Sequence, residues 1–241
     1  MPRPDTEIER ALAVAAHPDD IDFGCAGTVA AWVDAGVEVT YLLVTRGDQG
    51  GFDDTPREQM AALREAEQRA AAAAVGVSDV RFLDGYRDGW VEPTRELERD
   101  IARVIRQVRP QRMIIQSPER NYQRLPASHS DHLAAGEAAI RAIYPTARNP
   151  FAWPEMLADE GLEPWVVTEV FIAGHPGADH AVDVTDTFER KLAALREHRS
   201  QTTHMADRLE PLLRDWGTRN AVLAGLDVGR LAETYLVSEL G

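Results

Sequence analysis

The stretch LAVAAHPDD, residues 12–20, decides the fold because an apolar run passes directly into a polar turn. The run from Leu12 to Ala15 predicts a buried strand, since short apolar segments bounded by turn residues are typical of covered strands. Pro18 fixes the backbone of the turn and prevents ordinary helix entry. We expect a helix only from about residue 24 to 35, so the segment predicts a strand, a turn and a helix in that order.

The same alternation continues along most of the chain. Further strands are expected at residues 37–44, 80–83, 113–115 and 166–172, with a short one at 181–184. Helical periodicity separates them at residues 56–75, 96–108 and 131–143, and Gly76 just past the first of these helices suits a helix end. Strands that alternate with helices predict an α/β fold with a mostly parallel sheet flanked by helices.

The C-terminal third has a different pattern. Helices are expected at residues 186–199, 205–216 and 219–226, followed by a short apolar segment at 235–237. A Pro-rich stretch at residues 144–163 predicts a surface loop. Because no Gly/Ser linker or charge block divides the chain, we expect residues 1–241 to form a single α/β domain with a helical C-terminal part.

Composition excludes several classes of protein. The net charge of −14 argues against a protein that binds nucleic acid through its phosphates, since such binding needs a basic face. Cys25 is the only cysteine, so neither an intrachain disulfide nor a cysteine-based zinc site can form. The apolar stretch at residues 11–16 is too short for a signal segment or a membrane span. We therefore expect a cytoplasmic enzyme without a membrane partner.

Unusual polar residues follow the expected strands at their carboxyl ends, where ligands bind in parallel sheets. Two clusters carry chemistry, one at residues 17–20 and one at 129–132. Two histidines and one carboxylate with an open water position suit catalytic zinc or a ferrous ion. A second carboxylate could then deprotonate the water, and a second loop histidine could face the developing oxyanion. Each cluster could alternatively be a simple helix cap.

Four short motifs resemble those of the LmbE-like, or PIG-L, de-N-acetylase family. AHPDD at residues 16–20, followed by Gly24 and Gly27, resembles the family signature. HSDH at residues 129–132 is similar to its second motif, with Ser130 where proline is commoner. REAE at residues 64–67 and HRSQ at 198–201 resemble its Arg-x-x-Glu helix and its late His-x-Ser-Gln element.

The resemblance implies a Rossmann-like fold and a zinc-dependent deacetylase that acts on groups of the N-acetylglucosamine type. Fe²⁺ or another divalent metal would suit the same positions. By matched position, His17, Asp20 and His132 would bind the metal. Asp19 would be the general base and His129 the electrostatic stabiliser.

The resemblance also implies that Arg64 and Asp88 hold the sugar. From the residues alone, Arg64 and Glu67 could instead form an intrahelical ion pair, and Asp88 could be a turn residue. One departure concerns the second motif: some family members have a tyrosine where this chain has Ala127. If that tyrosine polarises the carbonyl, another residue must do so in this chain.

Two other classes of function would need different residues from those of a deacetylase. A nucleotide-binding Rossmann enzyme would need Gly-x-Gly-x-x-Gly in the first turn, where the charges of the HPDD sequence would repel a pyrophosphate. A non-catalytic binding protein of the same fold would not need the complete set of aspartates and histidines. The expected partner is a small N-acetylated amino-sugar compound. Trp90 and Trp153 on expected loops could stack on its ring or serve contacts in a homo-oligomer.

Overall fold

A computed structural model describes residues 2–52, 54–122, 125 and 128–240. Within these ranges the strands form one seven-stranded sheet in the order β3-β2-β1-β4-β5-β7-β6. The strands are β1 (Arg10–Ala15), β2 (Glu38–Leu43), β3 (Asp79–Phe82), β4 (Arg112–Gln116), β5 (Glu169–Ala173), β6 (His180–Asp183) and β7 (Ala232–Glu239).

Five neighbouring strands of this sheet, from β3 to β5, run parallel. Leu12 of the central strand β1 lies opposite Thr40 on one side and Met113 on the other. Because parallel strands share one direction, the loops at their carboxyl ends meet at one edge. The predicted mostly parallel α/β architecture is confirmed, and only β7 runs antiparallel to its neighbours β5 and β6.

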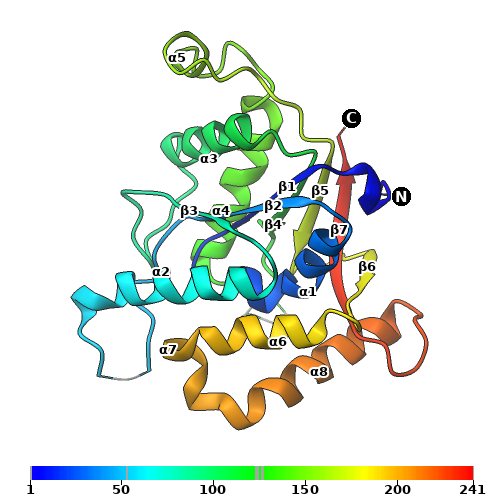
Figure 1. Ribbon diagram of the computed structural model, residues 1–241. Helices are drawn as coiled ribbons and strands as arrows, with labels where there is room; N and C mark the ends of the chain where they lie inside the picture. Colours follow the sequence, from blue (N-terminus) through cyan, green and yellow to red (C-terminus); the bar gives the residue numbers. More distant parts are fainter. Residues whose placement is uncertain (1, 53, 123–124, 126–127, 241) are drawn as a thin grey trace.

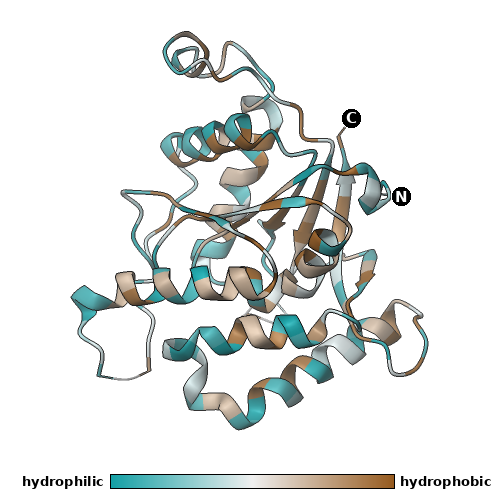
Figure 2. Ribbon diagram, in the orientation of Figure 1, coloured by the Kyte–Doolittle hydropathy of each residue, from teal (hydrophilic) through white to brown (hydrophobic). Residues whose placement is uncertain are grey.

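Helices cover both faces of the sheet (Figure 1). One apolar core lies between the sheet and helices α3 and α4, and another between the sheet and helices α1, α2 and α6. Figure 2 shows the strands in apolar colours and the helices with one apolar and one polar side. The helices are α1 (Asp20–Asp34), α2 (Arg57–Ala74), α3 (Arg95–Val108), α4 (Ser130–Arg141), α5 (Glu155–Ala158), α6 (Phe188–Glu197), α7 (Arg199–Thr202) and α8 (Ala206–Leu223). Short turns of other helix types lie at Asp5–Glu7, Ala142–Thr146 and Thr203–Met205.

The helices differ from the sequence predictions in several places. Helix α5 lies within residues 144–163, the stretch predicted as a surface loop, and Pro154 directly precedes its first turn, where proline is tolerated. Helix α1 begins at Asp20, only two residues after Pro18, and not near residue 24. Helix α8 passes through Gly217, where two separate helices were predicted. A Cβ atom at Gly217 would lie 3.2 Å from the Cβ of Leu231, so this glycine allows a close packing contact and does not end the helix.

The last strand was not predicted as a strand. The apolar segment at residues 235–237 is part of β7, which lies inside the sheet. The buried carboxylate of Glu233 on β7 accepts hydrogen bonds from Lys191 of α6 and from Thr28 and Gly27 of α1. The hydroxyl of Tyr235 donates to the same carboxylate. These bonds join β7 to two helices on one face of the sheet.

Within the described ranges, no helix has both the length and the hydropathy needed to cross a membrane.

Candidate active site

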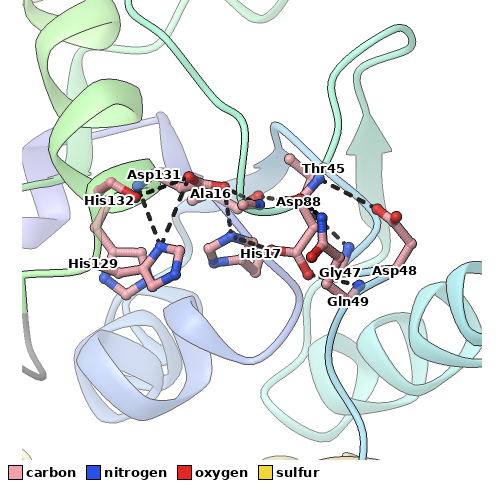
Figure 3. A network of polar contacts seen from close by, with 12 residues as sticks. Ala16, His17, Thr45, Gly47, Asp48, Gln49, Asp88, His129, Asp131 and His132 are labelled. Carbon is pink, nitrogen blue, oxygen red and sulfur yellow. Dashed lines mark hydrogen bonds and ion pairs between the residues drawn. The ribbon is translucent and has the colours of Figure 1, made fainter.

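Three loops at the carboxyl edge of the sheet bring the chemistry-bearing residues together (Figure 3). The turn after β1 carries His17, Asp19 and Asp20, and the loop after β3 carries Asp88. The loop after β4 leads to the start of α4, at residues 129–132. The parallel direction of β1, β3 and β4 therefore places these segments, far apart in sequence, around one small volume.

Three histidines form the centre of the site. The ring centroids of His17 and His129 are 5.2 Å apart, those of His17 and His132 are 5.3 Å apart, and those of His129 and His132 are 5.4 Å apart. One ring nitrogen from each lies within 4.8 Å of one from each of the others. Histidine nitrogens at such separations could share one metal ion.

Carboxylates surround His17 on both sides of its ring. Its Nδ1 atom lies 3.2 Å from Asp20 Oδ2, while its Nε2 atom lies 3.0 Å from Asp88 Oδ1 and 3.1 Å from Asp131 Oδ2. The other oxygen of Asp20, Oδ1, is 3.0 Å from His132 Nε2. If Nε2–H donates to Asp88 and Asp131, the lone pair of Nδ1 faces Asp20. Metal-binding histidines are commonly oriented in this way by carboxylates.

The carboxylates around His17 make the site favourable for a positive charge. Burial opposes protonation of His17, but the charge of Asp20 and hydrogen bonds to Asp131, Asp20 and Asp88 raise its pKa to about 12. Burial also opposes ionisation of Asp20, yet His132 and His17 hold its pKa well below its usual value. Because carboxylates and imidazole nitrogens are both ligands for divalent metals, the residues present fit such an ion. Besides the three histidines, the side chains of His17, Asp88 and Asp131 also lie close enough together to hold a metal.

Asp19 lies beside this cluster in an unusual backbone conformation. Its φ angle of 87° is in the left-handed region, which few residues other than glycine adopt. The backbone N–H of Asp19 donates to Gln68 Oε1 at 2.9 Å. Its Oδ2 atom lies 3.3 Å from Arg64 Nη2, and Arg64 also donates to the carbonyl oxygens of Pro18 and Gly47. Burial raises the pKa of Asp19 to about 6, although the charge of Arg64 opposes this rise.

Arg64 and Glu67 do not share the intrahelical pairing considered from sequence. Glu67 accepts bonds from the backbone N–H and the hydroxyl of Ser200, whereas Arg64 faces the Asp19 turn. Thus the REAE and HRSQ segments contact each other, and both lie next to the site.

Asp88 and His129 have structural roles that sequence reasoning offered as alternatives. Asp88 accepts the backbone N–H of Gln49 at 3.0 Å in addition to facing His17. His129 Nδ1 accepts the backbone N–H of Asp131 at 3.2 Å and so caps helix α4. The His129 side chain is 47% exposed, and capping occupies only one of its two ring nitrogens. Ala127, the position of the family tyrosine, lies outside the described residues.

Sequence reasoning assigned no role to several residues that contact the site. Asp131 belongs to the quoted HSDH motif, and its acidic side chain next to a predicted ligand was the available signal. Gln68 lies one helical turn after Arg64, on the same face of α2. His198 begins the HRSQ motif, and its Nε2 atom lies 2.8 Å from Asp22 Oδ2, 176 residues earlier in the chain.

A family model and two sequence relatives point to one family of deacetylases. Residues 12–143 match the model of the PIG-L family, described as GlcNAc-PI de-N-acetylase. The chain is 32% identical over 199 residues to a diacetylchitobiose deacetylase of Thermococcus kodakarensis, covering 82% of this chain and 72% of that protein. It is 30% identical over 270 residues to a 1D-myo-inositol 2-acetamido-2-deoxy-alpha-D-glucopyranoside deacetylase of Kineococcus radiotolerans, covering 85% and 72%.

A solved structure extends the similarity to nearly the whole chain. N,N'-diacetylchitobiose deacetylase from Pyrococcus horikoshii, in complex with an inhibitor, superposes with a TM-score of 0.88 at 29% identity. The superposition covers 98% of this chain and 86% of the other.

Proposed function

Because this chain belongs to the PIG-L family of de-N-acetylases, we propose that it hydrolyses the N-acetyl amide of a small amino-sugar compound and releases acetate. One observation carries the proposal. The carboxylate of Asp20 lies between His17 and His132, with the partly buried carboxylate of Asp19 on the preceding residue. This arrangement supports a metal-binding set with an adjacent base, the two components of metal-assisted amide hydrolysis.

His17, Asp20 and His132 are the proposed metal ligands, and zinc is the proposed metal. A ferrous ion or another divalent metal would suit the same nitrogen and oxygen donors. Asp88 and Asp131 support the assignment of His17, because donation from Nε2–H to these carboxylates leaves the lone pair of Nδ1 free to bind the metal on the side of Asp20. The bound metal would supply Lewis acidity for water and for the acyl carbonyl.

Asp19 is the proposed general base. A base works best when its pKa is close to the working pH, and burial raises the pKa of Asp19 to about 6. In the proposed reaction Asp19 accepts a proton from the attacking water, and the carbon–nitrogen bond breaks as the amine takes up a proton. His129, on the facing loop, would donate a hydrogen bond to the carbonyl oxygen as negative charge develops there. With Ala127 in place of tyrosine, His129 is the proposed source of that stabilisation.

The proposed substrate class is a compound that contains N-acetylglucosamine. The relatives named above act on diacetylchitobiose and on an acetamido-deoxyglucosyl inositol. We keep Arg64 and Asp88 as the proposed substrate-recognition residues. The Nε atom of Arg64 is buried and has no hydrogen-bond partner among the described residues, so one donor of this guanidinium is left unused beside the Asp19 turn. The acidic net charge of −14 suits a neutral or cationic ligand.

Matched amide substitutions at the two neighbouring aspartates test the mechanism. Asp19→Asn should retain metal and reduce acetate release by about a hundredfold to ten-thousandfold, the range for a lost acid–base group. Asp20→Asn should instead lose metal. Asp207→Asn, at an exposed position on α8, serves as the control. Metal content by elemental analysis and acetate release from N,N'-diacetylchitobiose are measured on each protein.

The outcomes separate the proposal from its alternatives. If Asp19→Asn loses the metal and Asp20→Asn keeps it, the two roles are exchanged. A fully active, metal-replete Asp19→Asn protein would falsify the mechanism. If the wild-type protein binds metal but releases no acetate from any N-acetylglucosamine compound tested, it is a binding protein of this fold.

A further inference from the structure

The backbone of Asp19 needs support from outside its own turn. Its φ angle of 87° is unfavourable for a residue with a side chain, and such conformations persist only where the surroundings hold them. On the backbone side, the bond from Asp19 N–H to Gln68 Oε1 provides that support. The direction of the Asp19 carboxylate therefore depends on where Gln68 presents its oxygen.

The orientation of the Gln68 amide is dictated by a buried carboxylate. Gln68 Nε2 donates to Asp22 Oδ2 at 2.7 Å, and His198 Nε2 lies 2.8 Å from the same oxygen. Asp22 Oδ2 accepts in this contact and the backbone N–H of Asp19 can only donate, so Gln68 presents its NH₂ group to Asp22 and its oxygen to Asp19. All three side chains, Gln68, Asp22 and His198, are fully buried.

This group of three residues is not arranged for stability alone. Asp22 Oδ1 and His198 Nδ1 are both buried without a hydrogen-bond partner among the described residues. Buried polar atoms without partners are costly, and an apolar packing of the same volume would avoid that cost. The group connects α1 and α2 with the segment before α7. Beyond the group, the oxygen of Gln68 accepts the backbone N–H of Asp19, the proposed base.

We propose that Gln68, oriented by Asp22 and His198, is a positioning residue that aims the carboxylate of Asp19 at the reacting water. The proposal rests on the role of Asp19 given under the proposed function. It assigns a purpose to His198, 179 residues after Asp19 in the sequence: His198 holds the carboxylate that orients Gln68, without itself touching substrate or metal.

Gln68→Met tests the proposal because it keeps the length and packing of the side chain and removes both hydrogen-bonding groups. We expect the turnover number to fall by about tenfold to a hundredfold, as for a small misplacement of a catalytic group. KM should change by less than about threefold, since the substitution removes no group that is proposed to bind the substrate. Metal content should stay at the wild-type level. Gln59→Met, at an exposed position of the same helix, is the matched control and should behave as wild type.

A double-substitution cycle separates positioning from general loosening. In an Asp19→Asn background, Gln68→Met should cause little further loss, because the group that it positions can no longer accept a proton. If Gln68→Met lowers turnover equally in both backgrounds, or leaves the wild-type turnover unchanged, the proposal is wrong. A fully active Asp19→Asn protein would instead overturn the proposed function, whatever Gln68→Met does.

A second pair of variants decides the matter if Gln68→Met does not fold. His198→Gln can still donate a hydrogen bond to Asp22, whereas His198→Leu cannot. We expect turnover to be higher in His198→Gln than in His198→Leu, with equal metal content in the two proteins. Equal turnover in both variants would show that the hydrogen bond from residue 198 to Asp22 has no effect on catalysis, and the proposal would be wrong.

Discussion

Removing the carboxylate of Glu233 should destabilise the protein strongly. This group accepts hydrogen bonds from Gly27 N, Thr28 N, Thr28 Oγ1, Lys191 Nζ and Tyr235 OH, and its side chain is only 5% exposed. Glu233→Ala leaves the buried Lys191 ammonium without a counter-charge. Breaking a buried ion pair in this way costs about 3–5 kcal/mol. For a protein of this size, that loss corresponds to a fall in melting temperature of roughly 6–20 °C.

The assay is denaturant unfolding followed by far-UV circular dichroism at fixed metal concentration. Glu92→Ala, an exposed position before α3, is the control and should change the free energy of unfolding by less than about 0.5 kcal/mol. The double variant Lys191→Met/Glu233→Leu replaces both charges by apolar groups. It should recover much of the stability lost in Glu233→Ala, since an apolar replacement of a buried pair is often close to neutral.

A loss below about 1 kcal/mol in Glu233→Ala would refute this reasoning, because that range is typical of exposed ion pairs. Failure of the double variant to recover stability would show that the bonds to Thr28 and Gly27 dominate over the charge on Lys191.

The remaining predictions concern the proposed site. His132→Ala should abolish high-affinity metal binding, measured by elemental analysis, because three protein ligands are the minimum for a catalytic zinc site; full metal retention would exclude His132 as a ligand. His129→Ala should keep the metal and lower the turnover number by about a hundredfold or more, whereas unchanged turnover would leave it as a helix cap. Asp88→Ala should raise KM for N,N'-diacetylchitobiose, because Asp88 is proposed to hold the sugar; a loss of metal affinity by about tenfold to a hundredfold in a chelator titration would make the orientation of His17 its main role. Arg64→Ala should raise KM for N,N'-diacetylchitobiose more than for a minimal acetamide; equal losses on both would make its contact with Asp19 its main role.

The sequence allows one feature of the candidate site to be predicted, namely that its residues lie close together. This prediction is possible because most of these residues follow strands. A parallel sheet places the carboxyl ends of β1, β3 and β4 at one edge, so His17, Asp88 and His132 meet whatever the details of the loops. Their nearness thus follows from topology. The contacts that orient them do not: nothing in the spacing of His17 and Asp131, 114 residues apart, indicates that Asp131 would accept from Nε2.

The parts that sequence reasoning missed depend on non-local partners. The apolar run at residues 235–237 follows a predicted helical segment, outside the strand–helix alternation, so the pattern does not predict a strand there. Strand β7 is stabilised by pairing with β5 and β6 and by the bonds of Glu233. The helical pattern around Gln68 does not distinguish it from its neighbours, since its partners Asp19 and Asp22 lie 46 or more residues earlier. Periodicity reports which face of a helix is buried, but not which polar group that face meets.

The position of β7 inside the sheet affects how the chain can fold during synthesis. Strands β5 and β6 leave the ribosome before β7, yet the structure pairs β6 with β7, and one edge of β5 is covered by β7 as well. Until residues 232–239 are available, both strands expose backbone groups that can pair with another chain. The buried Lys191 also lacks its counter-charge during that interval. A chain shortened before β7 would therefore tend to aggregate rather than fold into the same sheet with one strand fewer.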